Sequence, residues 1–351
     1  MKKTFRVVGL MSGTSLDGLD IAYCEFTQNA GGWTFASGPG LTISYDNSLK
    51  EQLQNARSYT GEDLSKLHVN YGKWIGTQVK NFMNENKLEV DFISSHGHTV
   101  FHQPEIGLTL QIGDLNHIAS ATQKTTIGDF RTLDVALGGQ GAPLVPIGDE
   151  LLFAQYDNCL NLGGIANVSF SKEGKRMAFD ICPVNIVLNV LAEHFGKPYD
   201  DGGKISAEGK VDAELLNRLL SVEFNKLSAP KSLGIEYIEK QYFPILKAST
   251  LSVNDQMRTF VEYIAQSIVA NVKPGSLLVT GGGAKNSFLI ERIKHNFKNG
   301  EVVVPENAVI DFKEAIIFAF LGVLRYMNLP NCLSSVTGAK KDCSGGVIVQ
   351  P

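Results

Sequence analysis

The stretch Val7-Val8-Gly9-Leu10-Met11-Ser12-Gly13-Thr14-Ser15-Leu16-Asp17-Gly18-Leu19-Asp20 determines how the rest of the chain is interpreted. Its apolar run 7–10 is typical of a buried strand, and a second apolar run covers 19–26. The turn between them is made of small and hydroxyl residues, which let the backbone approach a ligand and add hydroxyl donors to N–H donors. Two interpretations stay open from this pattern alone: a turn that cradles phosphate oxygens, and an ordinary hairpin with a glycine-rich turn.

The overall composition is that of an ordinary globular protein. The chain has 351 residues, more than one small core normally holds, so we predict two domains. Its hydrophobic fraction is 43% and its net charge is −4, which gives no indication of a nucleic-acid or acidic-membrane partner. The apolar run 7–11 is too short for a signal-peptide core, and no window reaches the length of a membrane span. The expected location is therefore the cytoplasm.

The cysteines and histidines do not point to a metal centre. The cysteine count is odd and no CxxC pair occurs, which argues against a disulfide framework and a structural zinc site. His96, His98 and His102 fall in a predicted loop without a nearby carboxylate partner, so hydrogen bonding to a substrate or satisfied loop polarity is favoured over metal binding. The five cysteines are Cys24, Cys159, Cys182, Cys332 and Cys343.

One pattern of strands and turns occurs twice along the chain. Residues 5–45 predict an antiparallel meander whose third strand covers 41–45, followed by a helical segment over 49–84. A second meander begins at Asn158, with a Gly163-Gly164 turn and a third strand over 177–181. We therefore predict an internal duplication of topology. Further strands are predicted at 90–94, 108–112, 276–280 and 302–304, and helices at 115–122, 143–153, 185–195, 208–221, 254–272, 286–294 and 312–327.

Charged residues surround a second glycine-rich segment. Asp129, Arg131 and Asp134 precede the loop 138–141, which opens a predicted helix near 143. Two interpretations remain open: an Arg–Asp pair that pins a crossover between domains, and direct contact of these side chains with a substrate.

The duplicated module, together with a late strand followed by Gly281-Gly282-Gly283, resembles the superfamily of actin, sugar kinases and heat-shock chaperones. The resemblance implies an α/β fold of two ribonuclease-H-like (actin-like ATPase) domains with a nucleotide cleft between them. We place the first domain at 1–125 plus about 333–351, and the second at 126–332. The nucleotide-binding residues that the resemblance implies are Gly9, Ser12, Gly13, Thr14, Ser15, Asp17, Gly18, Asn161, Gly163, Gly164, Asn167, Gly281, Gly282 and Gly283.

A set of motifs in fixed order narrows the resemblance to the bacterial anhydro-N-acetylmuramic acid kinases. It covers nearly the whole chain, and its specificity lies in the order of the motifs, because each one alone is weak. The set comprises Gly9 to Gly18, Ser95-His96-Gly97, Gln111-Ile112-Gly113, Asp129-Phe130-Arg131, Gly138 to Pro146, Asn161 to Asn167, Tyr199-Asp200, Lys231-Ser232 with Gly234, Glu236 and Tyr237, and Val336 to Ala339.

The resemblance implies a specific reaction. Enzymes of that family open the ring of 1,6-anhydro-N-acetylmuramic acid with water and phosphorylate the 6-oxygen with ATP and Mg²⁺, which gives N-acetylmuramic acid 6-phosphate in peptidoglycan turnover. It implies Asp180 as the general base, Glu314 as a second catalytic acid, and Asp17 and Asp20 as Mg²⁺ ligands. The implied substrate-binding residues are His96, Gln111, Asp129, Arg131, Asp134, Gln140 and Asn185.

The chain departs from the family pattern at one point. The family's stretch Phe-Asp-Thr-Gly-Pro-Gly-Asn corresponds here to 179–185, where Cys182 and Val184 replace both glycines. We expect the added side chains to narrow the sugar pocket, while Cys182, with no evident histidine partner, is not interpreted as a nucleophile. Two alternatives therefore stay open: a related sugar kinase with a shifted substrate, and a non-catalytic ATP-binding regulator. The implied partners are ATP and an anhydro amino sugar, and a homodimer remains open.

Overall fold

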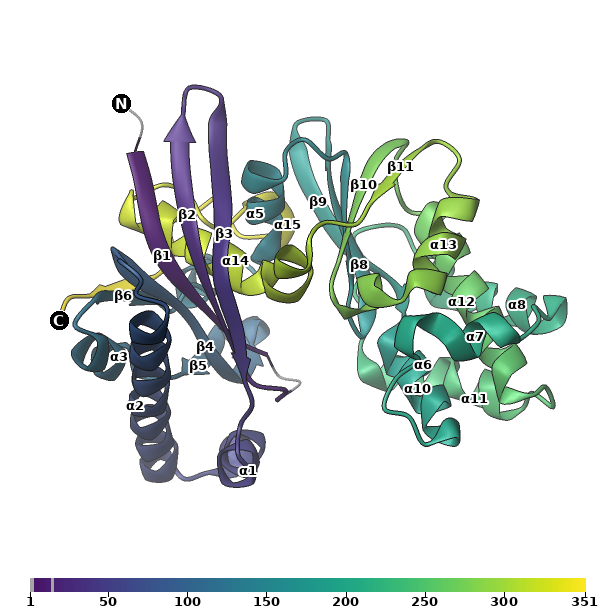
Figure 1. Cartoon of the computed structure of the whole chain (residues 1–351), viewed down its shortest axis with the longest axis horizontal. Coiled ribbons are helices and arrows are strands. Elements are labelled where there is room, and N and C mark those ends of the chain that lie inside the picture. Colours follow the sequence, from purple (N-terminus) through teal and green to yellow (C-terminus); the bar gives the residue numbers. More distant parts are fainter. Residues whose placement is uncertain (1–2, 14–15) are drawn as a thin grey trace. The chain divides into compact units, whose positions relative to one another are not determined.

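The computed structural model describes residues 3–13 and 16–351, and these separate into two compact units (Figure 1). The first unit comprises Met1–Leu152 with Phe312–Pro351, and the second comprises Phe153–Asp311. The sequence placed the two crossovers near 125 and 333. The first crossover lies later in the structure because the strand at 125–128 belongs to the sheet of the first unit, and the second lies earlier because the chain from Phe312 onward already belongs to that unit. None of the described helices is long and apolar enough to cross a lipid bilayer.

The first unit is built on a seven-stranded mixed sheet in the order β12-β6-β4-β1-β2-β3, with β5 paired to β4. Strands β1 to β3 form an antiparallel meander, and β4 and β6 continue the sheet in parallel with β1. The strands are β1 (Lys3–Ser12), β2 (Leu19–Asn29), β3 (Gly32–Ile43), β4 (Phe92–Gln103), β5 (Leu108–Ile112), β6 (Thr125–Gly128) and β12 (Val347–Val349). The helices are α1 (Asn47–Asn55), α2 (Gly61–Glu85), α3 (Leu115–Thr122), α4 (Thr132–Ala136), α5 (Val145–Leu152), α14 (Asn307–Tyr326) and α15 (Ser334–Thr337).

Alternation along β1 directs its residues to two different layers. Val8 and Leu10 belong to a buried cluster with Tyr71 and Ile75 of α2. Gly9 faces the other way, as strand geometry requires, and meets α14: a Cβ at this position would lie 2.1 Å from the carbonyl oxygen of Ala315. The missing side chain therefore lets α14 pack directly on β1.

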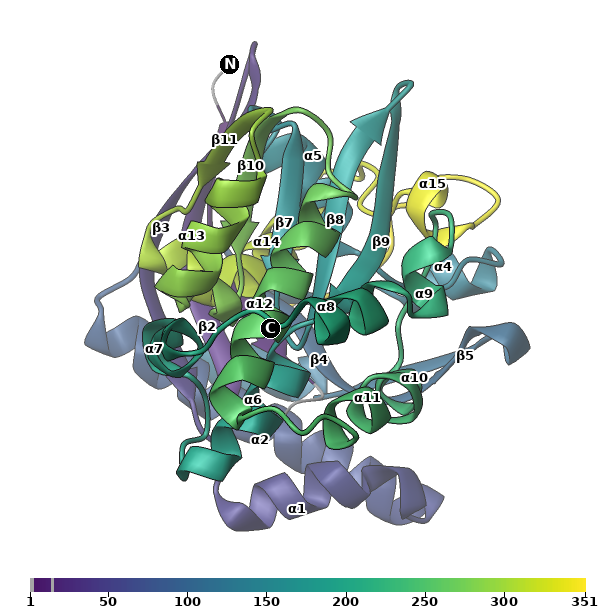
Figure 2. The same ribbon diagram turned by 90° about the vertical axis from the view of Figure 1, so that its right-hand side faces the viewer.

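The second unit repeats the same strand order in a five-stranded sheet, β11-β10-β7-β8-β9 (Figure 2). Again three antiparallel strands form a meander, and two further strands extend it in parallel. The strands are β7 (Asn158–Leu162), β8 (Ile165–Lys172), β9 (Lys175–Pro183), β10 (Gly275–Thr280) and β11 (Gly300–Val303). The helices are α6 (Asn185–Ala192), α7 (Lys204–Glu208), α8 (Ala213–Leu220), α9 (Glu223–Lys226), α10 (Ile235–Gln241), α11 (Phe243–Lys247), α12 (Val253–Val269) and α13 (Ser287–Asn296).

The shared order β3-β2-β1-β4-β6 and β9-β8-β7-β10-β11 confirms the predicted duplication and the α/β fold class of two ribonuclease-H-like units. Three local predictions need correction. The third strand begins at Gly32, not at 41. The helical segment 49–84 is two helices, because Thr60 caps the start of α2 by accepting a hydrogen bond from the Asp63 N–H group. The histidine stretch lies in strand β4, because β1 and β5 flank it as hydrogen-bonded partners.

Candidate active site

A row of three polar residues crosses the sheet of the second unit. Asn161 of β7 is paired directly with Asn167 of β8, which is paired with Asp180 of β9. Directly opposed residues of neighbouring strands point to the same face, and all three side chains are only half-buried. The row therefore presents two amides and one carboxylate on one face of the sheet.

The Asp180 carboxylate is held from one side. Its Oδ2 accepts hydrogen bonds from the backbone N–H of Leu233, at 2.9 Å, and from the Ser232 hydroxyl, at 3.2 Å. Burial raises its pKa, and these two hydrogen bonds oppose the rise. A carboxylate with a raised pKa is a stronger base than an exposed one. Ser232 belongs to the ordered motif set but not to the predicted site residues, and that motif is its only signal in the sequence.

Two glycine-rich turns meet at the ends of the parallel strands β7 and β10. Thr280, the last residue of β10, is paired with Asn161, and each strand continues into a glycine turn. Gly281 has φ +82°, and a Cβ there would lie 2.4 Å from the Asn161 Oδ1 atom. A side chain is excluded at this position by both conformation and space. The Asn185 amide donates to the Leu162 carbonyl, at 3.4 Å, in the same region. The predicted second phosphate loop and adenosine loop are thus neighbours within this unit.

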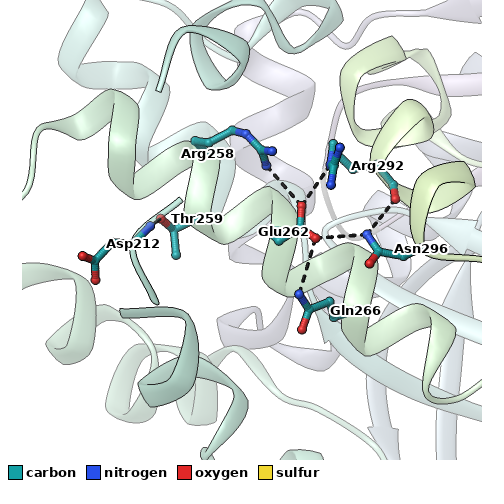
Figure 3. A network of polar contacts seen from close by, with 7 residues as sticks. All are labelled: Asp212, Arg258, Thr259, Glu262, Gln266, Arg292 and Asn296. Atoms are coloured by element: carbon teal, nitrogen blue, oxygen red, sulfur yellow. Dashed lines mark hydrogen bonds and ion pairs between the residues drawn. The ribbon is translucent and has the colours of Figure 1, made fainter. Parts of the chain in front are cut away.

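A buried charged network anchors the helix that follows Gly281–Gly283. Glu262 of α12 accepts hydrogen bonds from Arg258 at 3.2 Å, from Arg292 at 2.9 Å and from Asn296 at 3.0 Å, the last two on α13 (Figure 3). Gln266 adds a fourth donor. Burial alone would raise the Glu262 pKa, but the hydrogen bonds from Arg292, Asn296 and Arg258 outweigh it and lower the pKa to about 2. The network holds α13 against α12, and α13 in turn fixes the end of the glycine turn that leads into it.

Cys182 and Val184 do not behave as the sequence led us to expect. Both side chains are fully buried in the apolar core of the second unit, beside residues such as Ile181 and Val187. Burial raises the pKa of the Cys182 thiol, which keeps it protonated. The expectation that these side chains narrow a pocket is wrong, because they fill the core instead of a surface.

In the first unit, the Ser12 hydroxyl points into the protein. It accepts a hydrogen bond from the Tyr45 hydroxyl at 2.8 Å and lies 3.2 Å from His98 Nδ1. Tyr45 in turn lies 2.8 Å from the Tyr71 hydroxyl. Burial lowers the pKa of His98 to about 4, so the imidazole is neutral at pH 7. The side chain of Ser12 is therefore engaged internally, and Tyr45 and Tyr71 are partners that no sequence signal indicated.

The remaining residues of the first loop differ in exposure. Asp17 is exposed, Gly13 is half-buried and Gly18 is buried. Asp20 is half-buried, and its Oδ1 accepts a hydrogen bond from the Thr42 hydroxyl at 2.6 Å. The predicted nucleotide residues Thr14 and Ser15 lie outside the described residues.

His96 and Arg131 form a pair that also holds the loop 138–141. Arg131 donates from Nε and Nη2 to His96 Nε2, at 3.0 and 2.9 Å, and from Nη1 to the Gly141 carbonyl at 2.6 Å. Burial and the Arg131 charge keep the His96 pKa well below its usual value, so His96 accepts as a neutral ring. Burial also lowers the Arg131 pKa to about 10, while the charge of Glu314 opposes that shift.

Glu314 stands near three charged groups of the same unit. Its side chain reaches solvent, but the surrounding protein desolvates it and raises its pKa, and the charge of Asp20 raises the pKa further. Lys313 and Arg131 oppose the rise. The neighbouring residue of α14, Lys313, forms a buried ion pair with Asp149 of α5 at 2.7 Å. This ion pair holds the part of α14 that carries Glu314 against α5. Asp149 was not singled out in the sequence.

Asp134 is fully buried and holds the loop 138–141 from within. Its Oδ2 accepts from the Gly141 N–H at 2.7 Å, and its Oδ1 accepts from the Thr337 hydroxyl at 2.7 Å. The Arg–Asp pair that the sequence left open is not formed by Asp134, because its carboxylate is occupied by Gly141 and Thr337 of the same unit and Arg131 bonds to His96 and Gly141 instead. Gln140 is exposed on the same loop.

The other two predicted substrate residues lie at the edges of this region. Asp129 has φ +60° and accepts a hydrogen bond from the Thr132 hydroxyl, and burial raises its pKa. The Gln111 amide donates to Thr109 and Thr99, at 3.0 and 3.3 Å. Each unit thus gathers one part of the predicted site. His96, Arg131 and Glu314 belong to the first unit, and Asn161, Asp180 and the glycine turns belong to the second.

Comparison with known proteins decides the family. Residues 5–351 match the family described as anhydro-N-acetylmuramic acid kinase. The chain belongs to that family. A relative of this name from Actinobacillus pleuropneumoniae serotype 7 is 36% identical over 97% of this chain and 98% of its own length. Relatives from Haemophilus influenzae and Gloeobacter violaceus carry the same name and are also 36% identical, over 97% and 95% of this chain, respectively, and the same shares of their own lengths.

A solved structure shows a looser likeness to this kinase-family chain. It is an activator of 2-hydroxyisocaproyl-CoA dehydratase from Clostridium difficile with bound ADPNP, with a TM-score of 0.43 and 14% identity over 92% of this chain and 97% of that one. A likeness this weak assigns neither fold nor function.

Proposed function

We propose that this chain is an ATP-dependent kinase that opens 1,6-anhydro-N-acetylmuramic acid with water and phosphorylates its 6-oxygen. Membership of the kinase family supports the sugar and the phosphoryl donor. The observation that carries the proposal is the row Asn161–Asn167–Asp180 beside the Gly281 turn. It combines a carboxylate of raised pKa with a turn that excludes side chains, which suits a general base next to a phosphate-binding loop.

The chemistry follows from these groups. Asp180 takes a proton from a water that attacks the anomeric carbon, and the bond between that carbon and the 6-oxygen breaks. The released 6-oxygen attacks the γ-phosphorus, and the bond to the β-phosphate oxygen breaks to release ADP. Phosphoryl transfer depends mainly on positioning and charge stabilisation. Under this proposal, His96, Gln111, Asp129, Arg131, Asp134, Gln140 and Asn185 position the sugar directly or hold its loops, and Glu314 acts as the second acid.

The first unit contains carboxylates suited to Mg²⁺. Asp17 is exposed and Asp20 is half-buried, and carboxylate oxygens with bridging waters are the ligands that Mg²⁺ prefers. We assign Asp17 and Asp20 as the groups that would hold it, directly or through water. A bound Mg²⁺ would neutralise part of the negative charge on the phosphates. The use of ATP places the enzyme in the cytoplasm under this proposal.

The test is a coupled ADP-release assay with the anhydro sugar, N-acetylmuramic acid, N-acetylglucosamine and glucose, followed by the same reaction in ¹⁸O-labelled water. We expect turnover with the anhydro sugar, and label at the anomeric oxygen of the product but not in the transferred phosphoryl group. Turnover with another sugar alone would favour the shifted-substrate alternative. No turnover together with ATP binding would favour the regulator.

A further inference from the structure

Two buried cysteines, Cys332 and Cys343, are paired across a short antiparallel bridge in the first unit. Each donates its backbone N–H to the carbonyl of the other, at 3.2 Å in both directions. Residues that exchange both hydrogen bonds in this way have Cα atoms about 5.5 Å apart. A disulfide needs about 4.4–6.8 Å, so the backbone is already arranged for a bond between the two sulfurs.

A buried asparagine keeps the two cysteines in register. The Asn331 side-chain amide donates to the Gly345 carbonyl at 2.8 Å and to the Leu321 carbonyl at 3.2 Å, and its oxygen accepts from the Gly345 N–H at 2.8 Å. These bonds flank the cysteine pair on both chain segments. The pairing therefore cannot slip without breaking three buried hydrogen bonds.

The sulfurs also meet the carboxylate that holds the glycine-rich loop. The Cys332 thiol donates to Asp134 Oδ1 at 3.1 Å, and the two sulfurs and a carboxylate oxygen of Asp134 all lie within 4.8 Å of one another. The contact between the two thiols lowers the pKa of Cys343, although burial and the charges of Asp134 and Asp342 oppose that shift, and the same contact, together with burial and Asp134, raises the pKa of Cys332. Cys343 is therefore the thiol with more thiolate character, and thiolate is the reactive form.

We propose that Cys332 and Cys343 form a reversible disulfide under oxidation by a hydroperoxide. The Cys343 thiolate attacks the peroxide, so that an S–O bond forms, the O–O bond breaks and one oxygen leaves as water. Cys332 then attacks the Cys343 sulfur, the S–S bond forms, and the second oxygen leaves as water. The two thiols lose two electrons and two protons, and hydrogen peroxide is reduced to two waters. A dithiol reductant reverses the bond.

The disulfide would act on the loop 138–141. Asp134 Oδ1 accepts from the Cys332 thiol and the Thr337 hydroxyl, and oxidation removes the first donor. Thr337 also accepts from the backbone N–H of Gln140, at 2.8 Å, so the change reaches the exposed Gln140. This consequence rests on the proposed function, in which the loop contacts the sugar. We expect a rise in the sugar KM of about tenfold, the effect of one hydrogen bond to a charged group.

Peptide mapping tests the bond without using activity. Trypsin cuts after Arg325, Lys340 and Lys341, so Cys332 lies in the peptide 326–340 and Cys343 in the peptide 342–351. After peroxide treatment and alkylation, we expect these two peptides linked in wild type and in Cys24→Ser, and separate in Cys343→Ser or after dithiothreitol. Alkylated, unlinked peptides from oxidised wild type would overturn the proposal.

Two further measurements separate the remaining outcomes. If the purified protein holds about one zinc per chain, and both cysteines react with alkylating reagent only after chelation, the cluster is a metal site and the proposal is wrong. If the linked peptides form but the sugar KM is the same before and after oxidation, control of the loop is refuted. If the linked peptides form and neither state turns over the sugar, the proposed function fails while the disulfide stands.

Discussion

Replacement of Glu262 by glutamine tests whether the charged network in the second unit stabilises that unit. The carboxylate is almost fully buried and receives four donors, two of them arginines, and its pKa is lowered from 4.5 to about 2. Since one pH unit of displacement corresponds to about 1.4 kcal/mol, ionised Glu262 contributes about 3 kcal/mol at neutral pH. Glu262→Gln should therefore lower the free energy of unfolding by about 3 kcal/mol at pH 7.

The sign of the pH dependence is fixed by the lowered pKa. The contribution is fully present above the unfolded-state pKa of 4.5 and is lost as the pH falls towards 2. At pH 3 only about 1 kcal/mol should remain, so the difference between wild type and Glu262→Gln should shrink by about 2 kcal/mol. Urea unfolding at pH 7, 5 and 3 measures this difference.

A matched control is available on the neighbouring helix. Glu291 of α13 is exposed, so Glu291→Gln should change the free energy of unfolding by less than about 0.5 kcal/mol. If Glu262→Gln costs no more than Glu291→Gln, or if its cost is the same at pH 7 and pH 3, the account of the network is refuted.

Four further outcomes follow from the structure. Asp180→Asn should keep the fold and lower turnover, measured by ADP release, by a factor of about 10²–10⁴. The control Asp201→Asn, at an exposed position, should leave turnover unchanged. Equal activity of the two variants would exclude Asp180 as the base. Gly9→Ala should destabilise the protein by about 1–3 kcal/mol or more in urea unfolding, because its Cβ would meet Ala315, while Gly61→Ala, which has open space, should not; a wild-type transition for Gly9→Ala would show that α14 can shift. Val184→Gly should cost about 2–4 kcal/mol of unfolding free energy and leave the ranking of sugars unchanged, and a new sugar preference would place Val184 at the pocket after all. ATP with Mg²⁺ at a hundred times its Kd should stabilise the native state by about 2.7 kcal/mol and raise the melting temperature, and no shift with ATP, ADP or a non-hydrolysable analogue would remove the kinase proposal.

The sequence predicted the elements whose signal is local. The repeated meander, the helix at 115–122 and the glycine turns at 163–164 and 281–283 are visible because strand alternation, helix periodicity and turn chemistry act over a few residues.

Contacts between distant segments could not be predicted in the same way. Nothing near Ser12 indicates that Tyr45 and Tyr71 occupy its hydroxyl, and nothing near Asp134 indicates Thr337, which is 203 residues away. The third strand was placed too late because residues 32–40 are rich in glycine and exposed side chains, so the pairing with β2 and not the pattern decides its start. Cys182 and Val184 were assigned to a pocket because the residues on either side of a core position do not reveal which way a side chain points.

The direct contact of β1 with α14 limits how this enzyme could acquire new sugars. Gly9 lets the two backbones touch at Ala315, one residue beyond Glu314, so the strand that leads into the first loop and the helix that carries the acid form a single rigid block. If Glu314 acts on the sugar as proposed, a larger sugar could not be accommodated by small shifts of Glu314, since any such shift would separate β1 from α14. In a library of variants selected for activity on larger sugars, substitutions should therefore accumulate at exposed positions such as Gln140 and Ser232. Positions 9, 315 and 319 should stay unchanged.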